Sequence, residues 1–314
     1  MATPKGPIIW GGPPRPPSIA ARAAVFRLLD ERDAFGGRPK AALFLVHPGP
    51  SLLVTLVTLA AASLALRGWP PADITIRLVL VMLPAQLAIG AANDVFDLAT
   101  DSTTKPHKPL VRGAASPSFA RAVVVVGVTT SLASAATLGA VPLIVTVAGL
   151  AAGLGYDVGL KRSPASWLAW WIGICAIPLG AYAAVQRTNA ALWWVIPLAG
   201  LLSVGLHCAN ALPDLEGDRA AGIRSLPVWL GPARSRIVLS AAPIAVVIMV
   251  FALRTRLHQT GVTLPICAAL LGLTALVVLS LTQTADPPRA GLGFPLLAVT
   301  SAATAVAWLA ALPQ

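Results

Sequence analysis

Charged residues are scarce in this chain. Only 11% of its 314 residues are charged and 56% are hydrophobic, whereas a soluble globular domain carries about 25% charged residues. Several apolar runs reach the roughly 20 residues that a helix needs to cross a bilayer, and a soluble core does not require runs of that length. The composition therefore predicts an all-α integral membrane protein and excludes an ordinary soluble domain.

Cysteine is also rare, with three residues in the whole chain. Cys175, Cys208 and Cys267 all lie inside apolar runs, and their spacing pairs none of them. They are expected to be small buried side chains. The sequence thus predicts neither a disulfide framework nor a cysteine-based metal site.

Acidic residues number 12 against 23 lysines and arginines, which gives a formal net charge of +11. Such a charge can indicate a nucleic-acid partner, but here the cations follow membrane topology. With the N-terminus inside, 18 lysines and arginines fall on the inner side of the membrane and 5 on the outer side, as expected for cytoplasmic loops. We therefore expect a cytoplasmic N-terminus, no nucleic-acid partner and a location in the plasma membrane of a prokaryote.

The apolar residues gather into nine segments. A basic arm rich in Pro and Gly precedes them over residues 1–40, and its residues 18–35 fit a short amphipathic helix as well as a flexible segment. Residues 41–314 are predicted to form a domain of nine transmembrane helices, with an error of roughly two to four residues at each boundary. The segments span residues 43–66, 74–93, 118–138, 140–157, 165–185, 191–212, 235–253, 264–282 and 290–311.

An acidic motif follows the second apolar segment. Asn93, Asp97 and Asp101 are spaced four apart, so on a helix they share one face, and Asp94 lies beside them. Carboxylates crowded at the end of a membrane helix repel each other and are costly to desolvate. This motif therefore predicts a bound cation.

A second motif follows the sixth apolar segment. Asn210, Asp214 and Asp218 repeat the spacing of the first motif at a displacement of 117 residues. Four spans separate the two copies, so both face the same side of the membrane. The two motifs hold six of the 12 acidic residues. This arrangement predicts a duplicated four-helix unit whose two acidic ends meet.

The chemistry of the two motifs points to a hard divalent cation and a diphosphate. Carboxylate and amide oxygens without a His/Cys cluster suit Mg²⁺ or Mn²⁺, and Mg²⁺ usually keeps coordination positions for substrate phosphates. Cations that could match the charge of a departing diphosphate flank the motifs. They are Lys105, Lys108, Arg112, Lys161, Arg219 and Arg224.

Several residues near the motifs have plainer explanations. Asp157 could pair with Lys161 or take part in the site, and Glu216 could pair with Arg219. His207, one turn before the second motif, is expected to be a buried histidine with its hydrogen bonds satisfied. Inner-loop cations such as Arg234 and Arg236 often serve only to set topology.

At these residues the chain resembles the UbiA superfamily of intramembrane prenyltransferases. That family has nine transmembrane helices in two pseudo-repeats, an N-D-x-x-D-x-x-x-D motif after helix two and a D-x-x-x-D motif after helix six. Its usual Arg-Pro-Leu/Ile-x-x-Gly-x-x-Ser run is similar to Lys108 through Ser116, where lysine keeps the charge but not the forked guanidinium. Tyr156 and Lys161 match a further family loop. Many members begin helix one with Arg-Pro, where this chain has His47-Pro48.

The resemblance implies Mg²⁺-dependent transfer of a prenyl group from a polyprenyl diphosphate to a hydrophobic acceptor, aromatic or lipid, within the membrane. The run from Glu216 to Val228 is similar to the chlorophyll-synthase and archaeal-lipid branches, over too short a stretch to assign an acceptor. The implied metal ligands are Asn93, Asp94, Asp97, Asp101, Asp214 and Asp218. Diphosphate contacts are expected from Asn93, Lys105, Lys108, Arg112, Tyr156, Lys161, Asn210 and Arg224, and Lys105, Lys108, Lys161 and Arg224 are expected to stabilise its departure.

Two other functions fit parts of the pattern. A UbiA-type terpene cyclase would ionise the same diphosphate without a second substrate, but the few aromatic residues (6%) offer little to steer a cation. A cation-coupled transporter would use the carboxylates as an ion site, but its acids are expected near mid-membrane and its repeats are often inverted. No obligate protein partner is indicated.

Overall fold

Helices make up the protein, as the sequence predicts. The structure is a computed structural model that describes residues 48–106, 108–187, 190–253, 257, 263–281 and 292–312, and no strand occurs within these ranges. The predicted arm over residues 1–40 and His47 lie outside the described residues.

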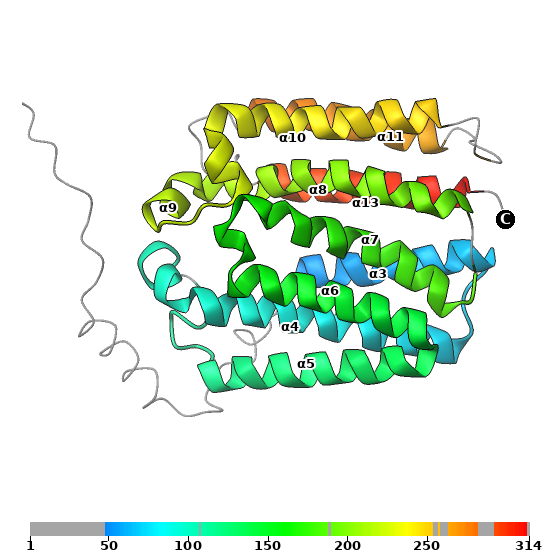
Figure 1. Cartoon of the computed structure of the whole chain (residues 1–314), viewed down its shortest axis with the longest axis horizontal. Helices are drawn as coiled ribbons and strands as arrows, with labels where there is room; N and C mark the ends of the chain where they lie inside the picture. Colours follow the sequence, from blue (N-terminus) through cyan, green and yellow to red (C-terminus); the bar gives the residue numbers. More distant parts are fainter. Residues whose placement is uncertain are drawn as a thin grey trace, which may run out of the picture.

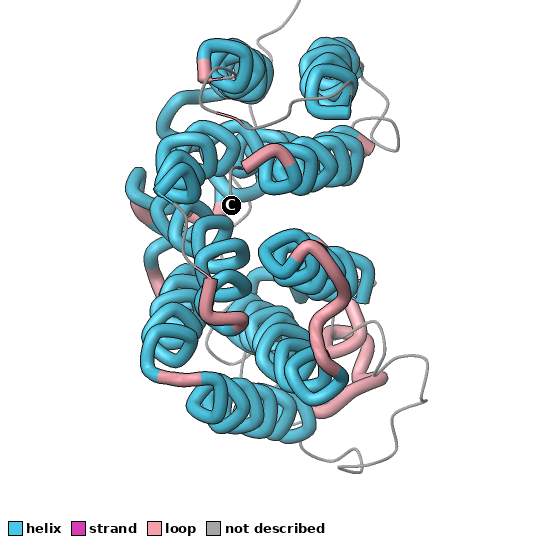
Figure 2. Tube along the Cα trace, turned by 90° about the vertical axis from the view of Figure 1, so that its right-hand side faces the viewer, coloured by secondary structure: helices cyan, strands magenta, loops and turns pink. Residues whose placement is uncertain are grey.

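Nine helical segments of the described chain are long and apolar enough to cross a membrane. They lie side by side along the long axis of the molecule in Figure 1 and appear end-on in Figure 2. Their main helices are α3 (Pro48–Leu66), α4 (Ala72–Thr104), α5 (Pro117–Leu138), α6 (Ala140–Val158), α7 (Trp167–Ala184), α8 (Val195–Ala211), α10 (Leu226–Ala252), α11 (Thr263–Leu281) and α13 (Gly293–Ala310). Short elements join them: η1 (Leu160–Arg162), η2 (Pro164–Ser166), η3 (Ala190–Trp194), η4 (Leu212–Asp214) and α9 (Leu215–Ala220). The predicted nine-span architecture is confirmed.

The outside of the bundle is apolar. Large hydrophobic side chains such as Val126, Ile144 and Ile248 are more than 60% exposed, although a soluble protein rarely leaves a continuous apolar surface to water. Lipid is the solvent that such a surface requires. The protein is therefore an integral membrane protein.

Small residues hold α4 against its neighbours. A Cβ atom added to Gly127 of α5 would lie 2.5 Å from the carbonyl oxygen of Pro84 in α4. The buried Ser131 hydroxyl donates a hydrogen bond to the carbonyl oxygen of Val81 at 2.7 Å. Without a hydrophobic driving force in lipid, such close approach and polar contact are what join membrane helices. The close packing of α4 against α5 thus supports the end of α4, which contains the first acidic motif.

Helix α4 extends well past the predicted boundary at residue 93. It continues to Thr104 because no residue between Ala91 and Thr104 breaks a helix, and it ends shortly before Pro106. The hydropathy drop at the acidic motif marks the limit of the apolar segment but not of the helix. The acidic motif therefore lies on a rigid element.

The start of α10 differs from the prediction. Helical structure begins at Leu226, whereas the apolar pattern predicted a start at residue 235. Gly231, with φ 76°, kinks the helix just before Pro232, so the first turns run in a different direction from the remainder. Arg234 and Arg236 consequently lie on a helix and not in a loop.

Candidate active site

The two acidic motifs meet at one end of the bundle. The last turns of α4 and the short helix α9 both lie at the left-hand end of the molecule in Figure 1. Lys105, directly after α4, forms an ion pair with Asp214 of η4, with 2.6 Å between its Nζ atom and the carboxylate. A side chain that directly follows the helix of the first motif therefore contacts the second motif.

Lys108 joins two acids of the first motif. Its ammonium group lies 2.7 Å from Asp94 and 2.6 Å from Asp101, and both carboxylates are almost fully buried. The two acids are seven residues apart, which places them two turns apart on the same side of α4. Burial alone would lower the pKa of Lys108, but the hydrogen bonds and charges of Asp101 and Asp94 outweigh this effect and raise it. Lys108 therefore remains protonated beside Asp94 and Asp101.

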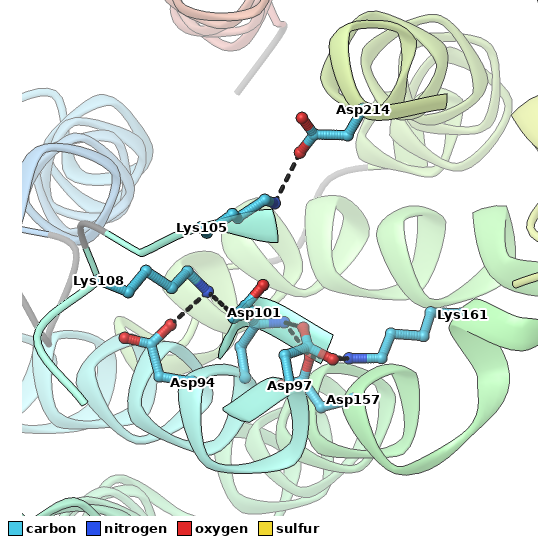
Figure 3. Close-up of polar contacts among 9 residues, drawn as sticks. Asp94, Asp97, Asp101, Lys105, Lys108, Asp157, Lys161 and Asp214 are labelled. Atoms are coloured by element: carbon cyan, nitrogen blue, oxygen red, sulfur yellow. Dashed lines mark hydrogen bonds and ion pairs between the residues drawn. The ribbon is translucent and has the colours of Figure 1, made fainter. Parts of the chain in front are cut away.

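A second group forms where α4 faces the end of α6. The Asn93 amide donates hydrogen bonds to Asp97 at 3.1 Å and to Asp157 at 2.8 Å. Lys161 of η1 pairs closely with Asp97, and its ammonium group lies 4.0 Å from Asp157. Figure 3 shows Asp97, Asp157 and Lys161 converging from α4, α6 and η1. Two carboxylates therefore surround one cationic group.

The second motif is more open than the first. Pro213 lies in η4, between α8 and α9, so Asn210, Asp214 and Asp218 lie on three successive elements. Asp214 is exposed and Asp218 is half-buried. Asp218 forms no ion pair with a described residue, although it interacts electrostatically with Asp214, Lys105 and Asp97.

Three predicted contact residues stay apart from the acids. The side chains of Arg112, Asn210 and Arg224 are exposed and form no ion pair or side-chain hydrogen bond with another described residue. The predicted Glu216–Arg219 pair is not formed either, because the Arg219 guanidinium reaches toward the carbonyl oxygen of Val228 at 3.5 Å. Among the predicted cations, the structure brings Lys105, Lys108 and Lys161 to the motifs.

An aromatic cluster borders the acidic groups. Tyr156, in the last turn of α6, contacts the rings of Trp170 and His207 at centroid distances of 6.4 and 5.9 Å. Trp170 in turn meets Phe294 of α13 edge-on. Tyr156 precedes Asp157 in the chain, so the aromatic cluster lies next to the acidic residues.

His207 also links the loops around the site. Its Nε2 atom lies 2.8 Å from the hydroxyl of Ser166, which accepts a hydrogen bond from the backbone N–H of Leu226 at 2.9 Å. These bonds join α8, η2 and the start of α10. The prediction of a buried histidine is correct, but only its Nε2 atom has a hydrogen-bond partner, because Nδ1 has none in the structure. No sequence signal marked Ser166.

The charges of the site are unbalanced. Six carboxylates face three ammonium groups, those of Lys105, Lys108 and Lys161. Acid and amide oxygens are the donor set that Mg²⁺ prefers. Within the described residues no group of three or more His, Cys, Asp or Glu side chains is arranged to hold a metal ion. The donor chemistry fits Mg²⁺, but the lysines would have to release the acids. The carboxylates are those of Asp94, Asp97, Asp101, Asp157, Asp214 and Asp218.

Sequence comparison decides the family. The sequence profile of the UbiA prenyltransferase family matches residues 54–294, which is most of the chain. The chain belongs to the UbiA prenyltransferase family. It is therefore an enzyme, a prenyltransferase, and the resemblance inferred from the two motifs is confirmed.

Named relatives within the UbiA family cover most of the chain. It is 28% identical to the bacteriochlorophyll synthase 33 kDa chain of Cereibacter sphaeroides over 76% of its own length and 83% of the relative. It is 27% identical to the digeranylgeranylglyceryl phosphate synthase of Pyrococcus horikoshii over 64% of its length and 73% of the relative. A UbiA homolog from Archaeoglobus fulgidus bound to GPP and Mg²⁺ shares the fold, with a TM-score of 0.65, 16% identity, and coverage of 85% of this chain and 99% of that one.

Proposed function

We propose that this UbiA enzyme transfers a prenyl group from a polyprenyl diphosphate to a hydrophobic acceptor within the membrane, with Mg²⁺ as cofactor and release of diphosphate. The ion pair between Lys105, just after the first motif, and Asp214 of the second carries the proposal, because it supports a shared space between the two motifs. One diphosphate could then contact both motifs.

The chemistry and position of each side chain suggest whether it would bind Mg²⁺ or the diphosphate. Carboxylate oxygens of both motifs would hold Mg²⁺, and the Asn93 amide, whose nitrogen now donates to Asp97 and Asp157, would turn to supply its oxygen. Lys105, Lys108 and Lys161 already lie among these carboxylates and would turn to the diphosphate oxygens. Arg112, Asn210, Arg224 and Tyr156 are proposed as outer contacts that close on the bound substrate. The proposed metal ligands are Asn93, Asp94, Asp97, Asp101, Asp214 and Asp218.

The surroundings of the site suit ionisation of an allylic diphosphate. When bound, Mg²⁺ would neutralise the diphosphate and match the charge that develops as it departs. The lysines add positive charge on the same side. The rings of Tyr156, Trp170 and Phe294 contact one another and would form an apolar wall that keeps water from the prenyl cation.

The acceptor and the membrane orientation are part of the same proposal. The two named relatives are bacteriochlorophyll and digeranylgeranylglyceryl phosphate synthases, which supports a large hydrophobic acceptor. The lysines and arginines concentrated on the side of the motifs support a cytoplasmic active site in a prokaryotic plasma membrane.

Product analysis tests the proposed reaction. Membranes that contain the protein are incubated with geranyl, farnesyl, geranylgeranyl or longer diphosphates, and the lipid extract is analysed by mass spectrometry. We expect a prenylated lipid product that disappears with EDTA and returns with Mg²⁺. Asp97→Asn should abolish it, whereas Asp73→Asn, at the opposite end of α4 and paired with Arg77, should not. A hydrocarbon product formed from the diphosphate alone would instead identify a terpene cyclase, and activity in EDTA would contradict the role of Mg²⁺.

A further inference from the structure

Asp157 lies outside both acidic motifs, yet its side chain reaches the first one. It occupies the last turn of α6 and is only 3% exposed. Its Oδ1 atom accepts a hydrogen bond from Asn93 at 2.8 Å, whereas its Oδ2 atom is buried and has no hydrogen-bond partner among the described residues. A buried carboxylate oxygen without a partner is strongly unfavourable, so this atom requires a positive or donating group.

No side chain in the part of the chain that the structure describes supplies that group. Lys161 is paired with Asp97, and its ammonium group is 4.0 Å from the other oxygen of Asp157, at the limit of an ion pair. The neighbouring Arg162 side chain is exposed. The oxygen is therefore available to a ligand that is not part of the chain.

We propose that Asp157 is a further metal ligand, which joins Asn93 and Asp97 to hold one Mg²⁺ ion at the first motif. This inference rests on the proposed function. Asn93 already contacts both carboxylates, so the three side chains converge on one place. Mg²⁺ is commonly bound by one or two carboxylates plus substrate phosphates, and this set needs no cage of three acids.

Charge balance supports the assignment. Two carboxylates match one divalent cation, whereas Lys161 alone leaves one negative charge over. Metal binding between Asp97 and Asp157 would displace the Lys161 ammonium and release it for the diphosphate. The alternative is that Asp157 carries a proton and serves only as a hydrogen-bond acceptor for Asn93.

Direct metal binding separates the two roles. Mn²⁺ is titrated into the purified full-length protein with inorganic pyrophosphate present, and the free ion is followed by electron paramagnetic resonance. Asparagine keeps the shape of aspartate and an acceptor oxygen but lacks the negative charge. If the carboxylate is a metal ligand, Asp157→Asn should therefore weaken Mn²⁺ binding about tenfold or more. Asp73→Asn, the matched control, should bind as the wild type does. Affinity within about twofold of the wild type for Asp157→Asn would overturn the proposal.

A cysteine substitution gives an independent test, because it predicts a gain in metal affinity and not a loss. A thiolate prefers soft ions, so Asp157→Cys should bind Cd²⁺ more tightly than the wild type if position 157 touches the metal, and Asp73→Cys should not. No gain for Asp157→Cys would also overturn the proposal. If the wild type binds no Mn²⁺, or Asp97→Asn leaves binding intact, the metal-dependent function itself fails, and that result differs from failure at Asp157 alone.

Discussion

At the scale of single residues, Lys108 determines the charge balance of the buried part of the first motif. Its ammonium group contacts both Asp94 and Asp101, whose side chains are 1% and 6% exposed. Since the raised pKa of Lys108 keeps it charged throughout the physiological pH range, these two acids always have a partner. Removing Lys108 would take away the ion pair that it forms with each of these two buried carboxylates.

Substitution of Lys108 tests this balance. Lys108→Met should destabilise the protein by about 3 kcal/mol or more, the usual cost of breaking a buried ion pair on one side, as measured by unfolding in detergent with EDTA present. Lys108→Arg should restore most of the stability, because a guanidinium can contact both acids. Arg77→Met, which breaks an exposed pair with Asp73, should cost less than about 1 kcal/mol. Equal stability for the two methionine variants would show that the buried pairs have no structural role.

Some residues of the site could be predicted from the sequence and others could not. The spacing of Asn93, Asp97 and Asp101 identified one helix face, because helical periodicity is a local property. Asp157 was visible as a carboxylate at the end of an apolar segment, but its contact with Asn93 spans 64 positions. Such a contact depends on how α4 and α6 pack, and one sequence does not encode it in any local pattern.

At the scale of elements, the packing of α4 against α5 fixes the position of the first motif at the end of the bundle. Hydropathy located all nine spans but placed the end of α4 too early and the start of α10 too late, since charged residues can continue a helix beyond the membrane. The second motif repeats the spacing of the first, but Pro213 lies within it and breaks the regular helix between α8 and α9. Breaks of this kind are set by proline chemistry, which the spacing did not take into account.

Gly127 offers a test of the α4–α5 packing. A methyl group at this position would meet the Pro84 carbonyl oxygen at 2.5 Å, and a backbone atom cannot move aside as a side chain can. We expect Gly127→Ala to destabilise the protein by about 1–3 kcal/mol, as overpacking usually does, and to lower thermal stability in detergent. Gly173→Ala in α7, where no atom lies within 4 Å of the added methyl, should be neutral or slightly stabilising. Unchanged stability for Gly127→Ala would contradict the close contact.

At the scale of the whole molecule, the two motifs share one end of the bundle, and the distribution of lysine and arginine predicts that this end is cytoplasmic. Single cysteines in a background without the three native cysteines test the orientation. Arg112→Cys near the motifs should react with a membrane-impermeant maleimide only after the cells are opened. Trp193→Cys, on an exposed side chain at the other end of the sixth span, should react in intact cells. The reverse labelling pattern would place the site outside.

The proposed function requires both acidic motifs to hold the same diphosphate. The direct test is a double-mutant cycle with Asp97→Asn and Asp218→Asn. Binding is measured by calorimetry with Mg²⁺ and a geranyl diphosphate analogue whose bridging oxygen is replaced by sulfur, so that no turnover intervenes. Because groups that share a ligand are strongly coupled, each single variant should lose about tenfold or more in affinity, and the double variant little more than the weaker single. Losses that multiply in the double variant, or normal affinity in either single variant, would show that the two motifs do not act on one ligand.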